Sequence, residues 1–261
     1  MPVYFVSHGG GPWPWIPEMA RDFAKTAQEF AKIPATLPQK PKAVLVITGH
    51  WEEPQFTVST SERPPMEYDY HGFPEHTYRI RYPAPGSTAL AQRVRELLAG
   101  SGITSAEDPK RGFDHGTFVP LSLMYPDADV PIVLLSLKSN YDPSEHIRVG
   151  EALQKLRDEG ILIIGSGLTY HNMRGFRQPG SMSVSQAFEG YLNDAITDPD
   201  SKSRNGKLER WETGPAARAA HPREDHLLPL MVVAGAAGDA AGKRLFVDNV
   251  MSVAMASYRF G

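Results

Sequence analysis

Three histidines occupy the same kind of position in this chain, just beyond an apolar segment with the pattern of a buried strand. The segments and their histidines are 3–7 with His8, 43–48 with His50, and 160–165 with His171, the last after a short Gly/Ser turn. Imidazole nitrogen is a common metal ligand, and its pKa near neutrality also suits it to proton transfer. From this pattern alone we expect His8 and His50 to share a metal ion.

Two more histidines stand in settings that suit a site. His115 lies in an Asp-His-Gly-Thr segment, and His226 opens an apolar segment that is expected to be helical over 226–237. Glycine adjoins His8, His50 and His115, and glycine lets the backbone approach a ligand closely or adopt a positive φ. The other four histidines lack such a setting and are expected at the surface or in loops: His71, His76, His146 and His221.

The composition excludes several other kinds of chemistry. The 261 residues include no cysteine, which excludes disulfides, thiolate nucleophiles, thiolate zinc sites and iron–sulfur clusters. Any metal must therefore be held by histidine, carboxylate or backbone oxygen. Lysine and arginine total 27 against 30 aspartates and glutamates, a formal net charge of −3. That balance shows no basic surplus of the kind that nucleic acid or an anionic membrane attracts.

Glycine-rich turns are present, but their spacing does not match the familiar nucleotide-binding or catalytic patterns. The glycine run at 9–11 is followed by proline and tryptophan, whereas a dinucleotide site needs spaced glycines that open a helix. The Gly-Ser-Gly segment at 165–167 lacks the two-residue spacing on each side of a nucleophilic serine elbow. No H-E-x-x-H motif occurs. The histidines therefore carry most of the functional signal.

Strand-like and helix-like segments alternate along the chain, which indicates an α/β fold. We expect a central mixed, largely parallel sheet covered by helices on both faces, in a single domain over residues 1–261. In open sheets of this kind, ligands bind beyond the carboxyl ends of the strands. The expected strands are 3–7, 43–48, 56–59, 77–82, 130–137, 160–165 and 251–259, and the expected helices are 18–32, 87–98, 143–159, 183–196 and 226–237.

Long irregular segments in a compact domain are usually functional, and this chain has two of them. Residues 61–76 are rich in proline, tyrosine and histidine and have the character of an ordered loop, whereas 198–222 is polar and resembles a mobile lid. We therefore expect the turn at 9–15, the loop at 61–76 and part of 198–222 to form the mouth of a pocket.

The sequence shows no targeting or membrane signal. Its first residues lack the basic and apolar regions of a secretory signal. No stretch approaches the roughly 20 apolar residues of a membrane helix. We therefore expect a cytoplasmic protein.

Several motifs, taken in order, resemble those of class III extradiol ring-cleaving dioxygenases, whose catalytic subunit has the LigB fold. They are Ser7-His8-Gly9-Gly10, Thr48-Gly49-His50-Trp51, Asp114-His115-Gly116, Gly165-Ser166-Gly167 leading to His171-Asn172-Met173-Arg174, and Asp225-His226-Leu227-Leu228-Pro229-Leu230. Segments 68–74 and 82–86 make the chain most similar to the DOPA 4,5-dioxygenase branch. The resemblance runs from residue 3 to about 255.

The resemblance implies an activity and a role for each histidine. The family opens a catechol ring next to its hydroxyls with O2 and one non-haem Fe(II), and zinc is associated with the DOPA-type branch. Carried over by motif, His8, His50 and His226 would bind the metal, His171 would be the acid/base, and His115 would orient substrate or oxygen. The implied partners are a small aromatic diol and O2. A histidine titrating near neutrality can both take a hydroxyl proton and return one.

Residues beside these motifs are candidate substrate contacts. Trp13, Trp51, Tyr68 and Phe73 could stack on an aromatic ring, with ordinary packing as the alternative for each. Asp114 could fix the tautomer of a nearby histidine, with a role as a loop cap as its alternative.

Other readings of the same residues stay open. Many non-haem iron oxygenases use two histidines and one carboxylate, so Glu224 or Asp225 could replace His226 as the third ligand. Segment 10–15 is richer in glycine and tryptophan than the Ser-Pro continuation of bacterial relatives, which leaves the natural catechol open. A zinc-dependent hydrolase and a Memo-like scaffold on the same fold are the alternative functions. The presence of both His115 and His171 favours chemistry, because a scaffold needs no acid/base.

Overall fold

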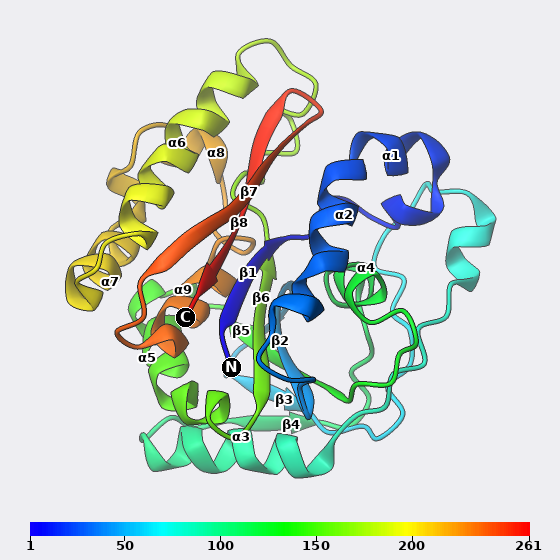
Figure 1. Cartoon of the computed structure of the whole chain (residues 1–261), viewed down its shortest axis with the longest axis vertical. Helices are drawn as coiled ribbons and strands as arrows, with labels where there is room; N and C mark the ends of the chain where they lie inside the picture. The colour runs from blue at the N-terminus through cyan, green and yellow to red at the C-terminus, as the bar shows by residue number, and fades with distance from the viewer.

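Eight strands form one sheet in the computed structural model, which describes residues 1–261. The strands are β1 (Val3–Ser7), β2 (Ala43–Glu53), β3 (Thr57–Ser59), β4 (Ala106–Asp108), β5 (Ile132–Lys138), β6 (Ile161–Gly167), β7 (Gly242–Val250) and β8 (Val253–Phe260). Their order across the sheet is β4-β3-β5-β2-β6-β1-β8-β7 (Figure 1).

The centre of the sheet is parallel and its flanks are mixed. β1 pairs with β6, β6 with β2 and β2 with β5, all in parallel. β8 runs antiparallel to β1, and β3 runs antiparallel to β5. The central strands are mostly apolar and almost wholly buried, as strands covered on both faces require. Their shared direction brings the carboxyl ends of β1, β2 and β6 to one edge.

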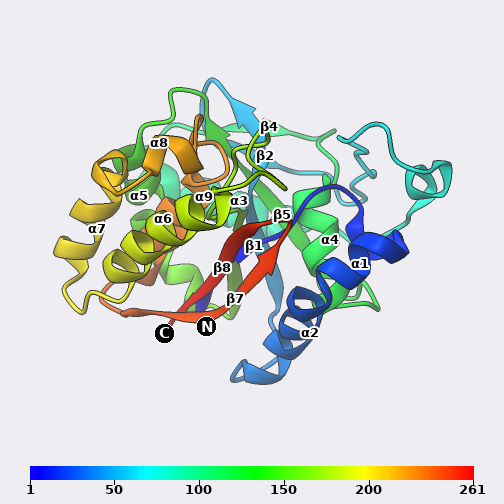
Figure 2. The same cartoon turned by 90° about the horizontal axis from the view of Figure 1, so that it is seen from above.

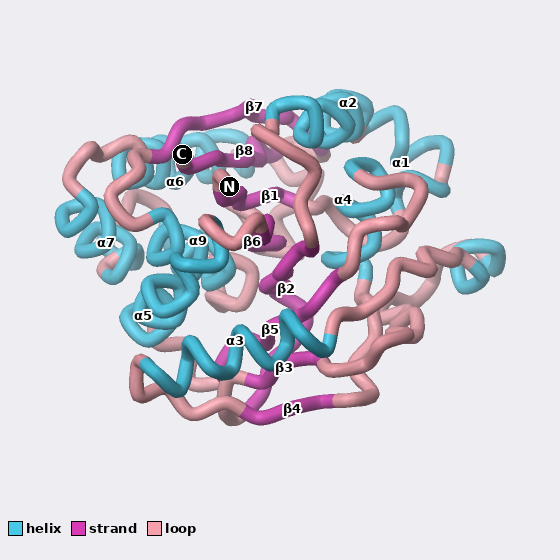
Figure 3. Tube along the Cα trace, turned by 60° about the horizontal axis from the view of Figure 1, so that its bottom comes forward, coloured by secondary structure: helices cyan, strands magenta, loops and turns pink.

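Helices cover both faces of the sheet, which confirms the expected mixed α/β architecture. They are α1 (Pro17–Asp22), α2 (Ala24–Lys32), α3 (Thr88–Gly100), α4 (His115–Met124), α5 (Pro143–Leu153), α6 (Ser181–Ile196), α7 (Ser201–Glu209), α8 (Ala217–Ala220) and α9 (Leu228–Ala237). Helices α5, α6, α7 and α9 lie on one side of the strands, and α1, α2 and α4 lie on the other (Figures 2 and 3). No helix has the length and apolar character that crossing a bilayer requires.

Helix α9 sits at the centre of its layer. All of its residues are buried, as expected for a helix that is apolar around its whole circumference. It packs against α5 and against strands β1, β2 and β6. This packing fixes the turn that precedes α9, and that turn carries His226.

Three segments differ from their expected conformation. Residues 77–82 form no strand: a short 3-10 helix covers Glu75–Arg79, and the prolines that follow cannot donate to a ladder. Residues 198–222 are not a loop, because they contain helices α7 and α8. Asp200 caps α7 by accepting hydrogen bonds from the backbone of Lys202 and Ser203. Residues 242–250 form an additional edge strand, β7, paired to β8.

Two histidines expected at the surface or in loops are fully buried. His146 lies inside α5, where its Nδ1 donates to the carbonyl of Asp142 at 2.7 Å and its Nε2 accepts from the backbone N–H of Lys138 at 3.2 Å. His221 packs edge-on against the rings of Phe188 and Trp211. Both ring nitrogens of His146 are satisfied, whereas those of His221 have no hydrogen-bond partner. The surrounding sequence indicated burial for neither residue. His71 and His76 are exposed as expected.

The buried His146 gives a prediction for stability against pH. Burial lowers the pKa of His146 to about 4, whereas the unfolded chain has a value of about 6.5. Between these two values, unfolding takes up a proton. The contribution of neutral His146 to the free energy of unfolding is therefore fully present above pH 6.5, and it is lost as the pH falls towards 4.

Between pH 6 and 4.5, we expect the free energy of unfolding of His146→Gln to fall less steeply with pH than that of the unaltered protein. The difference in slope should be up to about 1.4 kcal/mol per pH unit. Urea unfolding at a series of pH values measures this slope. His76→Gln, which changes an exposed histidine, should keep the slope of the unaltered protein. Equal slopes for all three proteins would show that His146 does not titrate on unfolding.

Candidate active site

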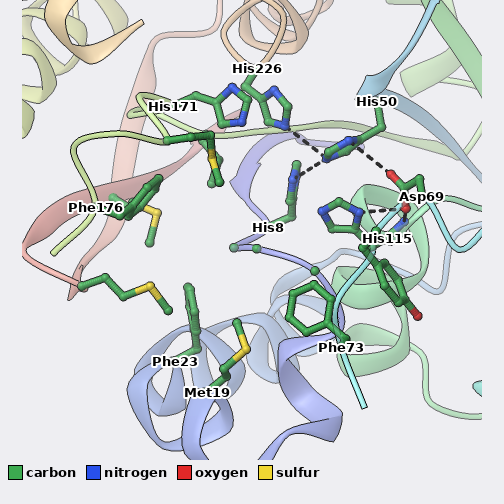
Figure 4. A pocket seen from close by; sticks show the side chains of 18 of the residues that line it. His8, Met19, Phe23, His50, Asp69, Phe73, His115, His171, Phe176 and His226 are labelled. Atoms are coloured by element: carbon green, nitrogen blue, oxygen red, sulfur yellow. Dashed lines mark hydrogen bonds and ion pairs between the residues drawn. The ribbon is translucent and has the colours of Figure 1, made fainter. Parts of the chain in front are cut away.

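The imidazoles of His8, His50 and His226 converge on one point at the carboxyl edge of the sheet (Figure 4). Nε2 of His50 lies 3.1 Å from Nε2 of His8 and 3.1 Å from Nε2 of His226. His8 follows the last residue of β1, and His50 lies where the register of β2 against β5 is interrupted. His226 comes from the turn before α9. Segments far apart in the sequence thus supply one cluster.

Two glycines allow His226 to reach this point. The backbone N–H of Leu168 donates to the carbonyl of His226 at 3.0 Å, which draws the turn onto the end of β6. A Cβ on Gly167 would lie 2.1 Å from that carbonyl oxygen, and a Cβ on Gly49 would lie 3.1 Å from Cγ of His226. Any side chain at Gly167 would displace the turn that holds His226.

The outer nitrogen of each ring has an oxygen partner. Nδ1 of His226 lies 2.8 Å from the Asp225 carboxylate, and Nδ1 of His50 lies 3.2 Å from the Asp69 carboxylate. Nδ1 of His8 lies 3.0 Å from Oγ of Ser166. The Ser166 hydroxyl donates to the carbonyl of Gly116, so it accepts from His8. Each ring therefore carries its proton on Nδ1.

This arrangement leaves three Nε2 lone pairs facing one another. With no proton between them they cannot hydrogen bond, and their mutual repulsion calls for a cation. Nitrogens bound to one tetrahedral zinc at about 2.0–2.1 Å would lie about 3.3 Å apart, close to the 3.1 Å separations of the cluster. The three residues fit a metal ion by donor type, tautomer and spacing.

The electrostatics of the cluster also favour metal binding. Burial lowers the pKa of His8 and of His50 well below the usual value, and the neighbouring imidazoles lower both further. Burial likewise lowers the pKa of His226 to about 4, although Asp225 partly opposes the shift. The three rings are therefore neutral at pH 7, which is the form that binds a metal.

His115 lies next to the cluster and is held by Asp69. It is the first residue of α4, which Asp114 caps by accepting from the backbone N–H of Thr117 at 3.0 Å. Asp69 Oδ1 accepts from the backbone N–H of His115 at 3.0 Å and from its Nδ1 at 2.8 Å. Asp69 thus joins His115 to His50, and Nε2 of His115 is left as an acceptor.

His171 lies on the opposite side of the cluster. Its ring stacks on that of His226 with centroids 3.5 Å apart. Its Nδ1 is 3.6 Å from Oδ1 of Asp225, too long for a hydrogen bond, and that buried oxygen has no other partner. Burial would raise the pKa of Asp225, but the adjacent imidazoles of His171 and His226 lower it below its usual value. Asp225 is therefore an anion poised to stabilise a protonated His171.

A cavity of about 450 Å³ opens beside the five histidines, and a sixth, the exposed His71, also contributes to its lining. Residues 9–11 and 69–73 contribute to its wall, as expected. Segment 198–222 does not, which corrects the expectation of a lid there, because α7 and α8 pack that segment against the body of the protein. Its place is taken by 168–176 and by two methionines near the turn between β7 and β8, Met251 and Met255.

Four of the expected substrate contacts lie outside the cavity wall, so we no longer assign them to substrate. Trp13 is buried against Phe23, and Trp51 is 4% exposed with its Nε1 donating to Glu53. The hydroxyl of Tyr68 donates to the carbonyl of Ile80. Asp114 is fully buried as the cap of α4. Packing and capping, the alternatives given for these residues, describe them better.

The structure also bears on the alternative third ligands and on a residue that the sequence did not single out. Glu224 pairs with Arg218 at 2.7 Å, and Asp225 contacts the outer nitrogen of His226 rather than the cluster centre.

Asp69 is the carboxylate that orients histidines, a role considered for Asp114. No spacing could reveal it, because its partner His115 lies 46 residues away.

Comparison with known proteins matches this architecture to one family. Residues 3–260 match the model of the catalytic LigB subunit of aromatic ring-opening dioxygenase. The chain belongs to this family. It is 41% identical over 269 residues to 4,5-DOPA dioxygenase extradiol of Beta vulgaris, covering 99% of this chain and 96% of that protein. It is 36% identical to the Escherichia coli (strain K12) protein of the same name, covering 90% and 85% of the two chains.

Two further relatives extend the comparison. Dioxygenase tasH of Hapsidospora irregularis is 36% identical over 278 residues, covering 100% of this chain and 85% of that protein. The crystal structure of an uncharacterized protein from Escherichia coli K12 has a TM-score of 0.80 and 32% identity, with 100% coverage of both chains. These findings confirm the extradiol ring-opening dioxygenase class, an oxidoreductase whose family depends on a non-haem metal.

Proposed function

We propose that this LigB-family enzyme opens the ring of a catechol-type, DOPA-like substrate with O2. His8, His50 and His226 bind the single metal ion, which is Fe(II) in the active enzyme, and Zn(II) can take the same site. The observation that carries this proposal is that Nε2 of His50 lies 3.1 Å from Nε2 of both His8 and His226. The relatives named 4,5-DOPA dioxygenase extradiol support the substrate class.

The remaining polar residues of the cavity handle orientation and protons. When bound, the metal supplies a Lewis acid that makes the catechol hydroxyls more acidic. His171 takes the second hydroxyl proton and later returns one, and the free Oδ1 of Asp225 stabilises the protonated ring. Nε2 of His115 accepts a hydrogen bond from the substrate and fixes its orientation, since Asp69 holds the other ring nitrogen.

The direct test is reconstitution of the metal-free protein with Fe(II) without oxygen, followed by O2 uptake with a panel of catechols. We expect uptake with equal consumption of catechol in the Fe(II) protein and little activity in a matched Zn(II) sample, because zinc has no redox chemistry. Tight binding of Fe(II) without O2 uptake for any catechol would contradict the proposed function. Equal hydrolysis of ester substrates by the Zn(II) protein would favour a hydrolase.

Asp69 provides a prediction about how the metal site is oriented. Its carboxylate accepts a hydrogen bond from His115 and lies 3.2 Å from Nδ1 of His50, whereas the amide of an asparagine has a single acceptor oxygen. We expect Asp69→Asn to weaken metal binding about 10–100-fold, the usual cost of losing a partner of a ligating histidine. Competition with a chelator of known affinity measures this change.

The matched control is Glu67→Gln in the same loop. Glu67 pairs with Arg111 and accepts from the backbone N–H of Gly112, so this change should leave metal affinity within about twofold of the original. If both variants lost affinity equally, loss of loop structure rather than of the Asp69 contacts would be the cause.

A further inference from the structure

We propose that the end of the cavity away from the histidines is a subsite for an uncharged, hydrocarbon-like substituent, so that the preferred substrates are alkyl- or aryl-substituted catechols rather than amino-acid catechols. The inference rests on the proposed ring-opening function, because it takes the histidine end as the place of the two hydroxyls. It keeps the catechol ring of the DOPA-like substrate proposed above but replaces the charged side chain of DOPA with an uncharged one. It depends on the chemistry of the opposite wall.

That opposite wall is built from thioethers and aromatic rings. Figure 4 shows the histidines and Asp69 gathered at one end of the pocket, with Phe23, Met19, Phe73 and Phe176 facing them across the cavity. The apolar residues used in this argument are Met19, Phe23, Phe73, Phe176, Met251 and Met255. Flexible thioethers adapt to irregular apolar shapes and make favourable contacts with rings. The wall therefore suits alkyl and aryl groups.

The wall offers a charged substituent neither a lysine nor an arginine as counter-ion. Outside the five-histidine cluster, the one basic side chain of the lining is the exposed His71, in the loop that carries Asp69. The carboxylate of Asp69, the lining acid, is taken by His50 and His115. Of the two arginines in the adjacent loop, Arg177 faces Asp22 at 3.7 Å and Arg174 is exposed, and neither lines the cavity. A substrate carboxylate or ammonium at this end would lose water without gaining a partner, which is costly.

The cavity is large enough for both ring and substituent. A dry cavity of about 150 Å³ holds benzene, and this one measures about 450 Å³. A ring with its hydroxyls at the histidine end would have the apolar residues as the wall facing it (Figure 4). A substituent of several carbons would therefore be buried, and each buried methylene should favour binding about fourfold.

The test compares 4-alkylcatechols from methyl to butyl with DOPA and 3-(3,4-dihydroxyphenyl)propanoate on the Fe(II) enzyme. We expect kcat/KM to rise about three- to fourfold per methylene, and both charged compounds to fall at least about tenfold below 4-propylcatechol. Phe176→Arg should reverse the order by lowering butylcatechol and raising the propanoate. Gln178→Arg adds the same charge outside the cavity wall and should change neither.

A binding measurement separates this inference from the proposed function. Dissociation constants of catechol, 4-butylcatechol and DOPA for the metal-free protein, measured without oxygen, should show the same preference for the butyl compound. If no catechol is turned over but the preference persists, the ring-opening function fails and the apolar subsite stands. If DOPA or the propanoate is bound and turned over as well as 4-propylcatechol, or if His71→Ala or Arg174→Ala selectively removes their turnover, the inference is overturned.

Discussion

Replacing His8 with alanine is expected to empty the metal site and abolish ring opening. His8 supplies one of the three Nε2 lone pairs and is fully buried, so no surface group can replace it. Metal content should fall from about one ion per chain to near zero, and O2 uptake with catechol should fall to background. The stabilisation by a bound metal, about 2.7 kcal/mol at a metal concentration 100 times Kd, should disappear as well.

Elemental analysis and thermal unfolding with and without added metal test this expectation together. His76→Ala is the matched control, because His76 is exposed and lies outside the cavity wall. That control should keep the metal and the metal-linked rise in Tm. A His8→Ala protein that binds metal as tightly as the unaltered chain would remove His8 from the ligand set, even if its activity were lost.

The central fold and the histidine cluster could be predicted because both depend on local signals. Strand β6 is a continuous apolar run with glycine at its end, which indicates a strand buried on both faces. Parallel pairing of β1, β2 and β6 then brings the ends of these strands to one edge. Histidines that follow such strands must lie near one another, whatever the details of packing.

The features that sequence reasoning missed depend on contacts between distant segments. Asp69 acts on His50 and His115 only because its loop folds over the edge of the sheet. His146 is buried because its ring lies against Phe56 and accepts from the backbone N–H of Lys138, although its own segment gives it no sign of burial. Periodicity describes one element at a time, so it cannot assign such partners.

The substrate wall shows the same limit in a different form. Tryptophans beside the histidine motifs were natural candidates for stacking, yet Trp13 and Trp51 are enclosed by their own neighbours. The wall is instead lined by residues such as Met19 and Met255 from opposite ends of the chain. Nothing in the local sequence of either methionine distinguishes a cavity residue from a core residue.

His171→Ala should separate proton transfer from metal binding. His171 stacks on His226, but its nitrogens take no part in the 3.1 Å contacts of the cluster, so metal content should stay near one ion per chain. Turnover of catechol should fall about 10²–10⁴-fold, the usual effect of losing a positioned acid or base. KM should change much less, because the apolar wall and the metal ligands remain.

The variant Asp225→Asn distinguishes a proton-transfer role from simple packing. The asparagine keeps the size of the side chain but removes the negative charge that would stabilise a protonated His171. Because Asp225 also contacts Nδ1 of the proposed ligand His226, the variant is assayed only after loading to one metal ion per chain. We therefore expect the pH profile of kcat to move in Asp225→Asn, whereas in His171→Ala the limb due to this histidine should vanish. Loss of metal from His171→Ala, with metal retained in His8→Ala, would mean that the ligand and the acid/base had been exchanged. A profile unchanged in both variants would exclude His171 as the group that carries the proton.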